Sequence, residues 1–453
     1  MLPDWRRTFN DILLRPWFDR AAVPMLARWY FPLSRAWAAG LQVGRDRVAF
    51  AEALGRSAVP AGLADAALAG LAARAETHAA AAARWDDAFF GETPAADLPG
   101  TEAARLDTAH DLMAARSLFA RLHMVHPVPA VRFAVAPPDE VLARHGARLG
   151  TPASAFALPE DSGPWEVSAA FDHRGRRTFW LRLPAPHPAQ PDDRLWARVV
   201  EPLDRPCVGT VVFTHGIAME DEHWRGRATP LGALTAQGFR LVLPEGPGHG
   251  RRRCPGLYGG EQVLGGGPMG LLDYLHGHVV DLGLLTAWAR GLDPLVPVAV
   301  GGVSLGALTA QMVATAAHQW PAENRPDALL LVTPSRSLEA VVFDGALTRA
   351  LGLPKVLADA GWTAEAIAPW RPLLEPVGPP AVDPARVVMV LGSADRVTPY
   401  LEGLALATAW TVPAANIFTG PRGHFTTAMS LSLNHDPRPL RRLVEVMGEG
   451  RGA

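Results

Sequence analysis

Lysine and cysteine are almost absent from this sequence of 453 residues. Lys355 is the only lysine, and it does not lie in a G-x-x-x-x-G-K-[ST] pattern, which excludes a phosphate-binding P-loop. Two cysteines, Cys207 and Cys254, are too few for a disulfide framework or a cysteine-rich zinc site. This usage is typical of a reducing compartment, so we expect a cytoplasmic protein without a cofactor.

An excess of positive charge is lacking as well. The chain has 43 lysine and arginine residues against 45 aspartate and glutamate residues, a formal net charge of -2. A nucleic-acid-binding protein would use a basic surface to neutralise phosphates, so we expect no nucleic-acid partner. Hydrophobic residues make up 49% and charged residues 19% of the chain, which is typical of a folded globular protein.

Long uninterrupted apolar segments are also missing. The "RRTFN" segment (6–10) is similar to a twin-arginine signal, but Asp11, Arg15 and Asp19 prevent an apolar stretch after it, so we expect no export signal there. The longest uncharged run, 294–322, contains Pro297 and several glycines. It therefore predicts a strand, a turn and a buried helix rather than a membrane span.

Motifs with the spacing of metal ligands are also missing from the sequence. His276 and His278, together with the acidic loop 220–223, could supply ligands, but their spacing matches neither H-E-x-x-H nor paired cysteines. A group of acids beside one histidine is more often a solvated loop. We therefore expect no metal site.

The first part of the chain is rich in alanine and predicts helices up to about Val125. One predicted helix starts at Thr101 as its N-cap and carries Leu106, Ala109 and Met113 on one face. A connector punctuated by prolines follows, so residues 1–160 are expected to form an N-terminal helical extension. Aromatic residues alternate with arginines in residues 1–40, which allows peripheral membrane contact; packing on the rest of the protein is the favoured alternative.

From Trp165 onward, short β segments alternate with helical ones, so residues 161–453 predict an α/β domain with a mainly parallel, twisted sheet flanked by helices. About fifty residues rich in Leu, Ala and Pro separate two of the later strands. They predict a helical cap at about 335–385. The expected strands lie in the segments 165–171, 177–183, 194–200, 209–216, 239–246, 296–302, 327–334, 386–393 and 415–420.

The segment "VAVGGVSLGALTAQ" (298–311) predicts a strand, a tight turn and a helix, with Ser304 at the tip of the turn. Side chains at positions 302 and 306 would collide with the neighbouring backbone, and Gly302 and Gly306 avoid this collision. The turn raises the serine hydroxyl above the sheet. It also places the N–H of Leu305 at a helix N-terminus, where it can donate to an oxyanion.

Two further residues follow later strands in a meaningful order. Asp395 follows the strand "VVMVLG", at the edge where open α/β sheets place their sites, and His424 lies in the loop after "NIFTG". A serine hydroxyl becomes a nucleophile when an imidazole takes its proton and a carboxylate orients that imidazole. With Ser304, these motifs make the segment from Trp165 to Gly448 resemble the α/β-hydrolase family, in which serine, acid and histidine occur in this order.

The resemblance implies an α/β-hydrolase fold and a catalytic triad of Ser304, Asp395 and His424. It also implies a second oxyanion donor, the N–H of Ile217, in the loop after the strand that ends near His215. His249, in the glycine-rich "LPEGPGHGRR" segment, is predicted to be structural rather than catalytic.

The sequence thus predicts an enzyme, a serine hydrolase that cleaves a carboxylic ester through an acyl-enzyme. Its partner would be a small-molecule acyl ester, with a medium or longer acyl chain because the cap segment is apolar. An acyltransferase or a peptidase would use the same triad, and a non-catalytic ligand-binding protein could retain the same fold. These alternatives stay open at the level of sequence.

Overall fold

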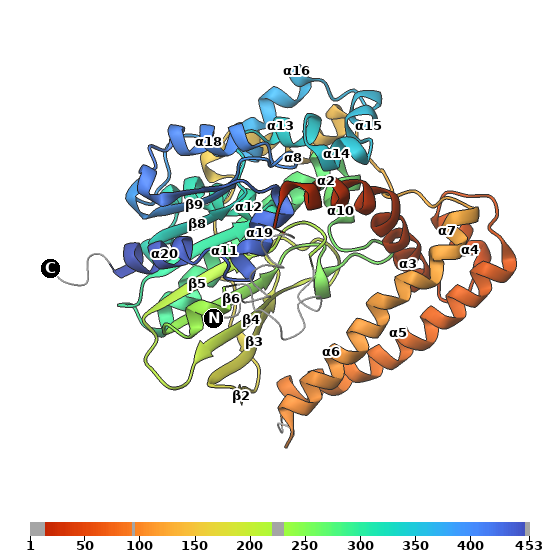
Figure 1. Ribbon diagram of the computed structural model, residues 1–453, viewed down its shortest axis with the longest axis horizontal. Helices are drawn as coiled ribbons and strands as arrows, with labels where there is room; N and C mark the ends of the chain where they lie inside the picture. The colour runs from red at the N-terminus through yellow and green to blue at the C-terminus, as the bar shows by residue number, and fades with distance from the viewer. Residues whose placement is uncertain (1–13, 93–95, 220–230, 449–453) are drawn as a thin grey trace, which may run out of the picture.

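The computed structural model describes residues 14–92, 96–219 and 231–448. A central sheet of ten strands crosses the molecule, as Figure 1 shows. Its strand order is β1-β3-β4-β6-β5-β7-β8-β9-β10, with β2 paired to β3. The strands are β1 (Glu166–Val167), β2 (Phe171–His173), β3 (Arg176–Pro184), β4 (Arg194–Pro202), β5 (Gly209–Thr214), β6 (Phe239–Glu245), β7 (Val298–Val303), β8 (Ala328–Val332), β9 (Val387–Gly392) and β10 (Ile417–Gly420).

Six neighbouring strands of the sheet, β6, β5, β7, β8, β9 and β10, run parallel to one another. Strands β1, β2, β3 and β4 pair in antiparallel fashion at one edge, and β4 is antiparallel to β6. Every residue of β5, β7, β8 and β9 is buried, because helices cover both faces of a parallel sheet. This arrangement confirms the expected α/β class with a mainly parallel sheet flanked by helices.

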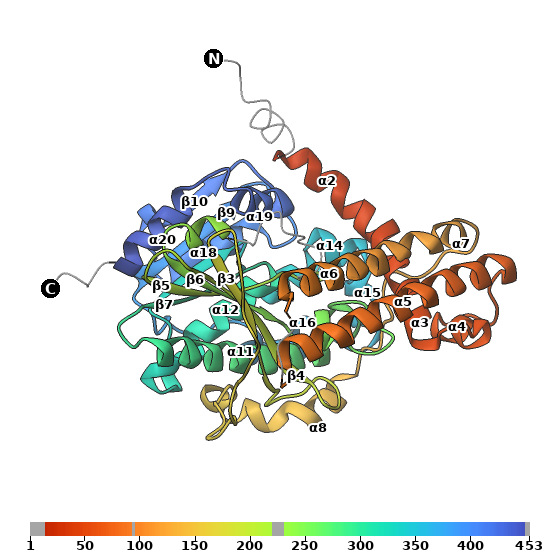
Figure 2. The ribbon, with the colours of Figure 1, turned by 90° about the horizontal axis from the view of Figure 1, so that it is seen from below.

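Helices of the α/β part lie on both faces of the sheet, and Figure 2 shows α11 and α20 on opposite sides. Alternate residues of β5 accordingly face two cores: Val212 packs with α11 and α12, and Val211 packs with α20. The helices of this part outside the cap are α9 (Gly232–Thr235), α10 (Glu261–Gly265), α11 (Gly267–Leu292), α12 (Leu305–Ala316), α18 (Tyr400–Ala409), α19 (His424–Ser432) and α20 (Arg438–Gly448).

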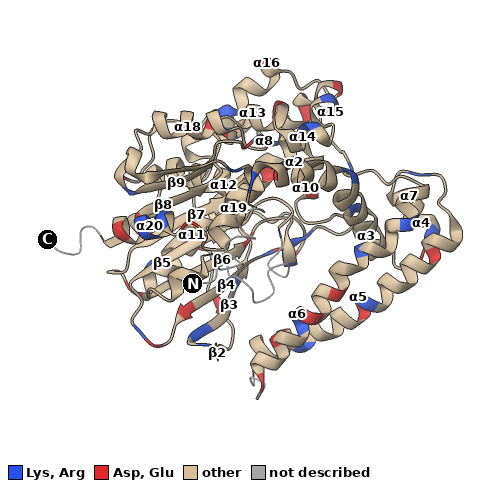
Figure 3. Ribbon diagram, viewed as in Figure 1, with Lys and Arg blue, Asp and Glu red and all other residues tan. Residues whose placement is uncertain are grey.

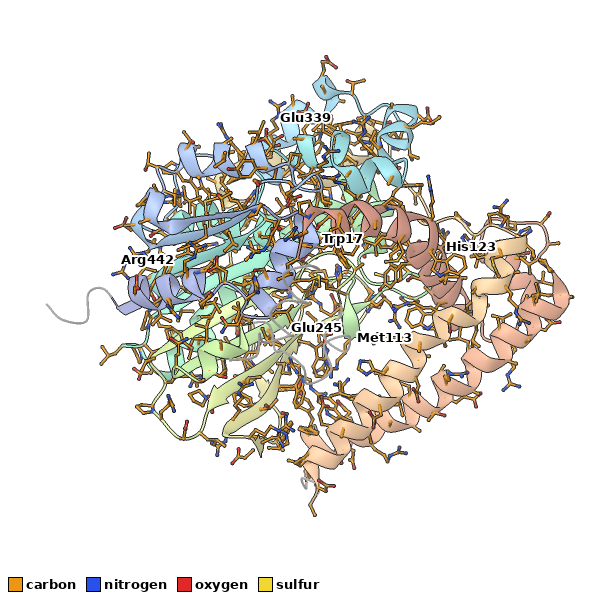
Figure 4. All side chains as sticks on the ribbon, in the orientation of Figure 1. Trp17, Met113, His123, Glu245, Glu339 and Arg442 are labelled. Carbon is orange, nitrogen blue, oxygen red and sulfur yellow. The ribbon has the colours of Figure 1, made fainter. Side chains whose placement is uncertain are left out.

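Five short helices connect β8 to β9 and lie at the top of Figure 1. They are α13 (Leu338–Phe343), α14 (Ala346–Ala350), α15 (Leu353–Asp359), α16 (Ala364–Ile367) and α17 (Arg371–Leu374), and Figure 4 labels Glu339 on α13. They occupy the segment for which a cap was expected. We retain the cap at 335–385 and the division at residue 160 as our proposed domain organisation.

The N-terminal region is helical and contacts the α/β part through several of its helices, among them α2, α6 and α8. A hairpin of α5 and α6 projects beside the sheet in Figures 1 and 2, and its end packs on the antiparallel edge through Trp85 and Phe89. Both rings lie 5.0 Å from the ring of Trp180 on β3, centroid to centroid. The helices are α2 (Pro16–Met25), a π-helical turn (Leu26–Tyr30), α3 (Phe31–Val43), α4 (Arg47–Ala53), α5 (Ala61–Phe90), α6 (Leu98–Ala114), α7 (Ala120–Val125) and α8 (Pro138–Leu149).

The expected start of one of these helices is wrong. Helix α6 begins at Leu98 rather than after Thr101, because the side chain of Asp97 accepts a hydrogen bond from the N–H of Gly100 and acts as the N-cap. Proline follows at the second helical position, where it costs no hydrogen bond. Ala109 and Met113 are buried on this helix, as expected.

The first residues bear on the possible membrane contact. Residues 1–13 lie outside the described ranges. On α2 and the turn after it, Trp17 and Trp29 are 48% and 40% exposed beside the exposed Arg20 and Arg28, and Figure 4 labels Trp17. Within the described ranges, no helix is both long and apolar enough to cross a bilayer. Peripheral contact through residues 1–40 stays a prediction.

Charged residues are distributed over the whole fold. Figure 3 shows acidic and basic residues interspersed along the helices and strands of both parts, including the α5–α6 hairpin. In the part of the chain that the structure describes, many of these charges are paired within one element or between neighbours, such as Arg47 with Asp65 and Arg442 with Glu445.

Candidate active site

Ser304 occupies a strained turn between β7 and α12. Its φ and ψ are 57° and -120°, in the positive-φ region that residues other than glycine rarely adopt. A Cβ on Gly302 would lie 2.3 Å from the carbonyl carbon of Gly306, and a Cβ on Gly306 would lie 2.5 Å from the oxygen of Thr214. Both glycines are therefore required for the turn, as the sequence pattern predicts.

The structure brings together the three residues expected to form the triad. Ser304 Oγ lies 2.9 Å from His424 Nε2, and His424 Nδ1 lies 2.8 Å from Asp395 Oδ2. All three side chains are at most 9% exposed. An ionised carboxylate only accepts hydrogen bonds, so Nδ1 carries the proton and Nε2 is left to accept the serine proton.

Asp395 is held by the backbone that follows it. Its Oδ1 accepts hydrogen bonds from the N–H groups of Val397 (2.8 Å) and Thr398 (3.1 Å). The hydroxyl of Thr398 donates to Oδ2 at 3.0 Å and lies 3.1 Å from His424 Nδ1. Thr398 therefore orients the carboxylate toward the imidazole. Sequence reasoning missed this residue, although a threonine three positions after an aspartate is a signal for such a turn.

The expected oxyanion donors lie on two sides of Ser304. Leu305 is the first residue of α12, so its N–H has no partner within the helix. Across from it, a Cβ on Gly216 would lie 3.3 Å from the Cβ of Ser304, which places the Gly216–Ile217 loop directly beside the nucleophile. The N–H groups of Leu305 and Ile217 stay the predicted donors to a negatively charged oxygen at Ser304.

Two histidines, the half-buried His215 and the buried His249, hold that loop in place. His215 Nε2 accepts a hydrogen bond from the N–H of Gly246 at 2.9 Å, and His249 Nε2 accepts from the N–H of Ala218 at 3.4 Å. Burial lowers the pKa of His215 to about 4 and that of His249 well below its usual value. Both rings are therefore neutral near pH 7, and each can accept from the backbone.

We expect stability to fall steadily from pH 6.5 to pH 4. The pKa of His276 is lowered to about 3, mainly by burial and secondly by the nearby His187. His215 and His276 therefore stay neutral in the folded protein, whereas histidines of the unfolded chain become protonated near pH 6.5. The unfolded state binds more protons in this window. The contribution of the two neutral imidazoles to the free energy of unfolding is therefore complete above pH 6.5 and is lost progressively as the pH falls toward 4. His215 alone accounts for roughly 3 kcal/mol. Burial raises the pKa of Glu261 to about 6, which opposes the trend by roughly 2 kcal/mol.

Urea denaturation at several pH values measures this effect. His276→Gln should reduce the slope of unfolding free energy against pH by up to about 1.4 kcal/mol per pH unit. The matched substitution His318→Gln changes an exposed histidine and should leave the slope unchanged. Equal slopes in wild type and His276→Gln would contradict the assignment of a neutral imidazole to the half-buried His276.

A contact from the N-terminal region reaches the site, and sequence reasoning missed it. Asp19 on α2 is 8% exposed, and its Oδ1 accepts a hydrogen bond from the N–H of Phe425 at 2.6 Å. Its Oδ2 accepts from the hydroxyl of Thr426 at 2.7 Å. Both donors belong to the first turn of α19, which begins at His424. The carboxylate thus caps the helix that carries the histidine.

The histidines considered as metal ligands have other partners. The ring of His276 contacts that of His187, with centroids 3.8 Å apart and planes tilted by 42°. Nε2 of His278 lies 2.6 Å from the hydroxyl of Thr214. The acidic loop 220–223 lies outside the described residues. Within the ranges that the structure describes, no group of three or more His, Cys, Asp or Glu residues is arranged to hold a metal ion.

Comparison with known proteins gives matches among solved structures only; no family model and no curated protein matches the chain. An acetyl xylan esterase from Paenibacillus sp. R4 is 13% identical, with a TM-score of 0.46 over 69% of this chain and 96% of that one. Acetyl xylan esterase 1 from Thermoanaerobacterium sp. is 16% identical, with a TM-score of 0.42 over 67% and 96%. An S-formylglutathione hydrolase from Agrobacterium tumefaciens is 11% identical, with a TM-score of 0.39 over 61% and 99%.

The features of this chain's own structure define its class. The mainly parallel sheet, the serine turn between β7 and α12, and the acid and histidine after β9 and β10 are features of the α/β-hydrolase fold. The chain has the α/β-hydrolase fold.

Proposed function

We propose that this protein is a serine hydrolase that cleaves carboxylic esters through an acyl-enzyme intermediate. One observation carries the proposal: the continuous hydrogen-bonded series from Ser304 through His424 to Asp395, built on a strained turn at the carboxyl edge of the sheet. A strained backbone at Ser304 and a buried carboxylate at Asp395 are features that folding alone does not favour, and they are typical of catalytic sites.

The geometry supports two half-reactions. As Ser304 Oγ attacks the ester carbonyl carbon, its proton passes to His424 Nε2, and Asp395 stabilises the imidazolium that forms. The N–H groups of Leu305 and Ile217 donate to the oxyanion. The imidazolium then protonates the leaving alcohol oxygen as the carbon–oxygen bond breaks. Water attacks the acyl-enzyme with His424 as base, and the acid leaves with Ser304 restored.

A cavity beneath the cap supports an apolar acyl group. It has a volume of about 110 Å³ and opens at Ser304. Most of its lining is aliphatic and comes from the cap and from the helices beneath it, including Leu271, Leu308, Leu338, Val341, Leu353 and Ile367. We propose that the acyl chain lies here, because burying each methylene contributes about 0.8 kcal/mol.

The expected result is a preference for medium or longer acyl chains. Each two-carbon extension should raise kcat/KM by about tenfold until the cavity is full, and acetyl esters should be poor substrates. The measurement is kcat/KM for acetyl, butyryl, octanoyl and palmitoyl esters of one alcohol. A maximum at acetyl with a steady decline thereafter would reject the acyl-chain proposal and leave the triad unaffected.

A pair of variants locates the effect. Val341→Phe fills the cavity and should move the optimum to a shorter chain. Val377→Phe makes the same change at a residue that is 61% exposed and should leave the chain-length profile unchanged.

A further inference from the structure

A second cavity meets the first at Ser304. Its volume is about 430 Å³, and it includes His424 and the loop around Ile217. Helix α2 and the π-helical turn after it form one of its walls, through Phe18, Ala22 and Leu26. Helix α19 forms another, through Phe425, Ala428 and Met429. These six side chains give the cavity an apolar lining.

The position of His424 assigns this cavity to one half of an ester. In the first half-reaction, the imidazolium transfers a proton from Nε2 to the leaving oxygen, so the group bonded to that oxygen must lie on the histidine side of Ser304. His424 lines this cavity, whereas it does not line the cavity beneath the cap. The acyl and alcohol halves of the substrate therefore have separate sites.

We propose that the cavity walled by α2 binds the alcohol part of the substrate, and that this alcohol is apolar. The inference rests on the proposed ester hydrolysis and adds the chemical class of the leaving group. Breaking the ester bond sends the electron pair to the alkoxide oxygen, which takes the proton from His424 and leaves as the neutral alcohol. The enzyme would then act on esters that are apolar on both sides of the carbonyl group.

Glu245 and His249, two of the polar side chains at this cavity, already have partners within the protein. Glu245 pairs with the guanidinium of Arg251 and accepts from its backbone N–H, and His249 Nδ1 contacts the carbonyl oxygen of Pro247 at 3.1 Å. A polar alcohol would compete with these contacts, whereas an apolar one would contact the aliphatic and aromatic lining without disturbing them.

The wall formed by α2 is fixed to the catalytic helix. Asp19 bonds to the N–H of Phe425 and the hydroxyl of Thr426, and that hydroxyl in turn accepts from the N–H of Gly423 at 2.9 Å. A Cβ on Gly423 would lie 2.3 Å from the carboxyl carbon of Asp19, so the two helices approach as closely as a glycine allows. These bonds hold the wall formed by α2 against the helix that carries His424.

The test uses octanoate esters of methyl, butyl and octyl alcohol with the full-length protein. These unactivated alcohols differ little in leaving-group chemistry, so a rise in kcat/KM with alcohol length reports binding in the cavity. We expect about tenfold per two carbons until the cavity is full. Ala22→Leu should lower the octyl-to-methyl ratio of kcat/KM about tenfold, because Ala22 is buried and lines the cavity.

Two further variants make the result decisive. Ala21→Leu makes the same change on the exposed side of α2 and should leave the ratio as in wild type. Leu26→Ala enlarges the cavity and should also lower the ratio, so the test does not depend on Ala22→Leu folding. An unchanged ratio in both cavity variants, or a flat alcohol profile in an active wild type, would overturn the inference. Absence of hydrolysis of every ester would instead overturn the proposed function.

Discussion

Replacing Ser304 with alanine is expected to abolish ester hydrolysis, with a loss of roughly 10⁶ in kcat. The substitution removes the oxygen that attacks the ester and leaves His424 and Asp395 without a nucleophile to activate. Alanine adds no atoms to the turn, so we expect the fold to be retained. The measurements are kcat with an octanoyl ester, labelling with a fluorophosphonate probe, and the thermal unfolding temperature.

Controls separate the possible outcomes of this experiment. Ser117→Ala removes an exposed hydroxyl that bonds only within its own helix turn and should retain full activity. Near-full activity of Ser304→Ala would refute the proposed function. Failure of the folded wild-type protein to react with the probe would favour a non-catalytic ligand-binding protein. Labelling without turnover of any ester or amide in water would favour an acyltransferase.

Replacing Asp395 with asparagine is expected to lower kcat by roughly 10⁴. The Oδ1 atom of asparagine can still accept from the N–H groups of Val397 and Thr398, so the loop should keep its shape. The amide nitrogen would then face His424 Nδ1, where the carboxylate accepts a proton donor in the wild type. Two donors cannot face each other, so the imidazole would carry its proton on Nε2 and could not accept from Ser304.

The structure supplies a matched control for this variant. Asp383 is exposed, and its carboxylate accepts from the N–H of Ala385, so Asp383→Asn should leave kcat unchanged. The measurement is kcat for both variants with the same ester, together with circular dichroism. A loss of less than about tenfold in Asp395→Asn would mean that another carboxylate orients the histidine.

Several parts of the fold and site depend on short segments and could be read from the sequence. The buried strands β7, β8 and β9 are continuous runs of apolar residues, and β5 differs only by Thr210 and Thr214. Such runs are typical of a parallel sheet covered on both faces. Gly302 and Gly306 reveal the turn at Ser304, because the steric collision that they avoid involves the backbone within and next to the turn. Asp395 and His424 each follow a strand, and they can be placed at the sheet edge because open α/β sheets have their sites at the carboxyl ends of the strands.

Other features depend on contacts between residues far apart in the chain, and only the tertiary structure decided them. Asp19 lies 406 residues before Phe425, and no spacing or periodicity in the sequence indicates that the two are bonded. Contacts between distant residues also form the wall that α2 contributes to the second cavity. They include the contact of His249 with the N–H of Ala218, in the loop after β5. Local sequence determined the nucleophile, its turn and the strands, because backbone sterics and burial patterns act over a few residues. The shape of the substrate site was decided by the packing of distant helices, because side-chain complementarity between them leaves no regular pattern in either segment.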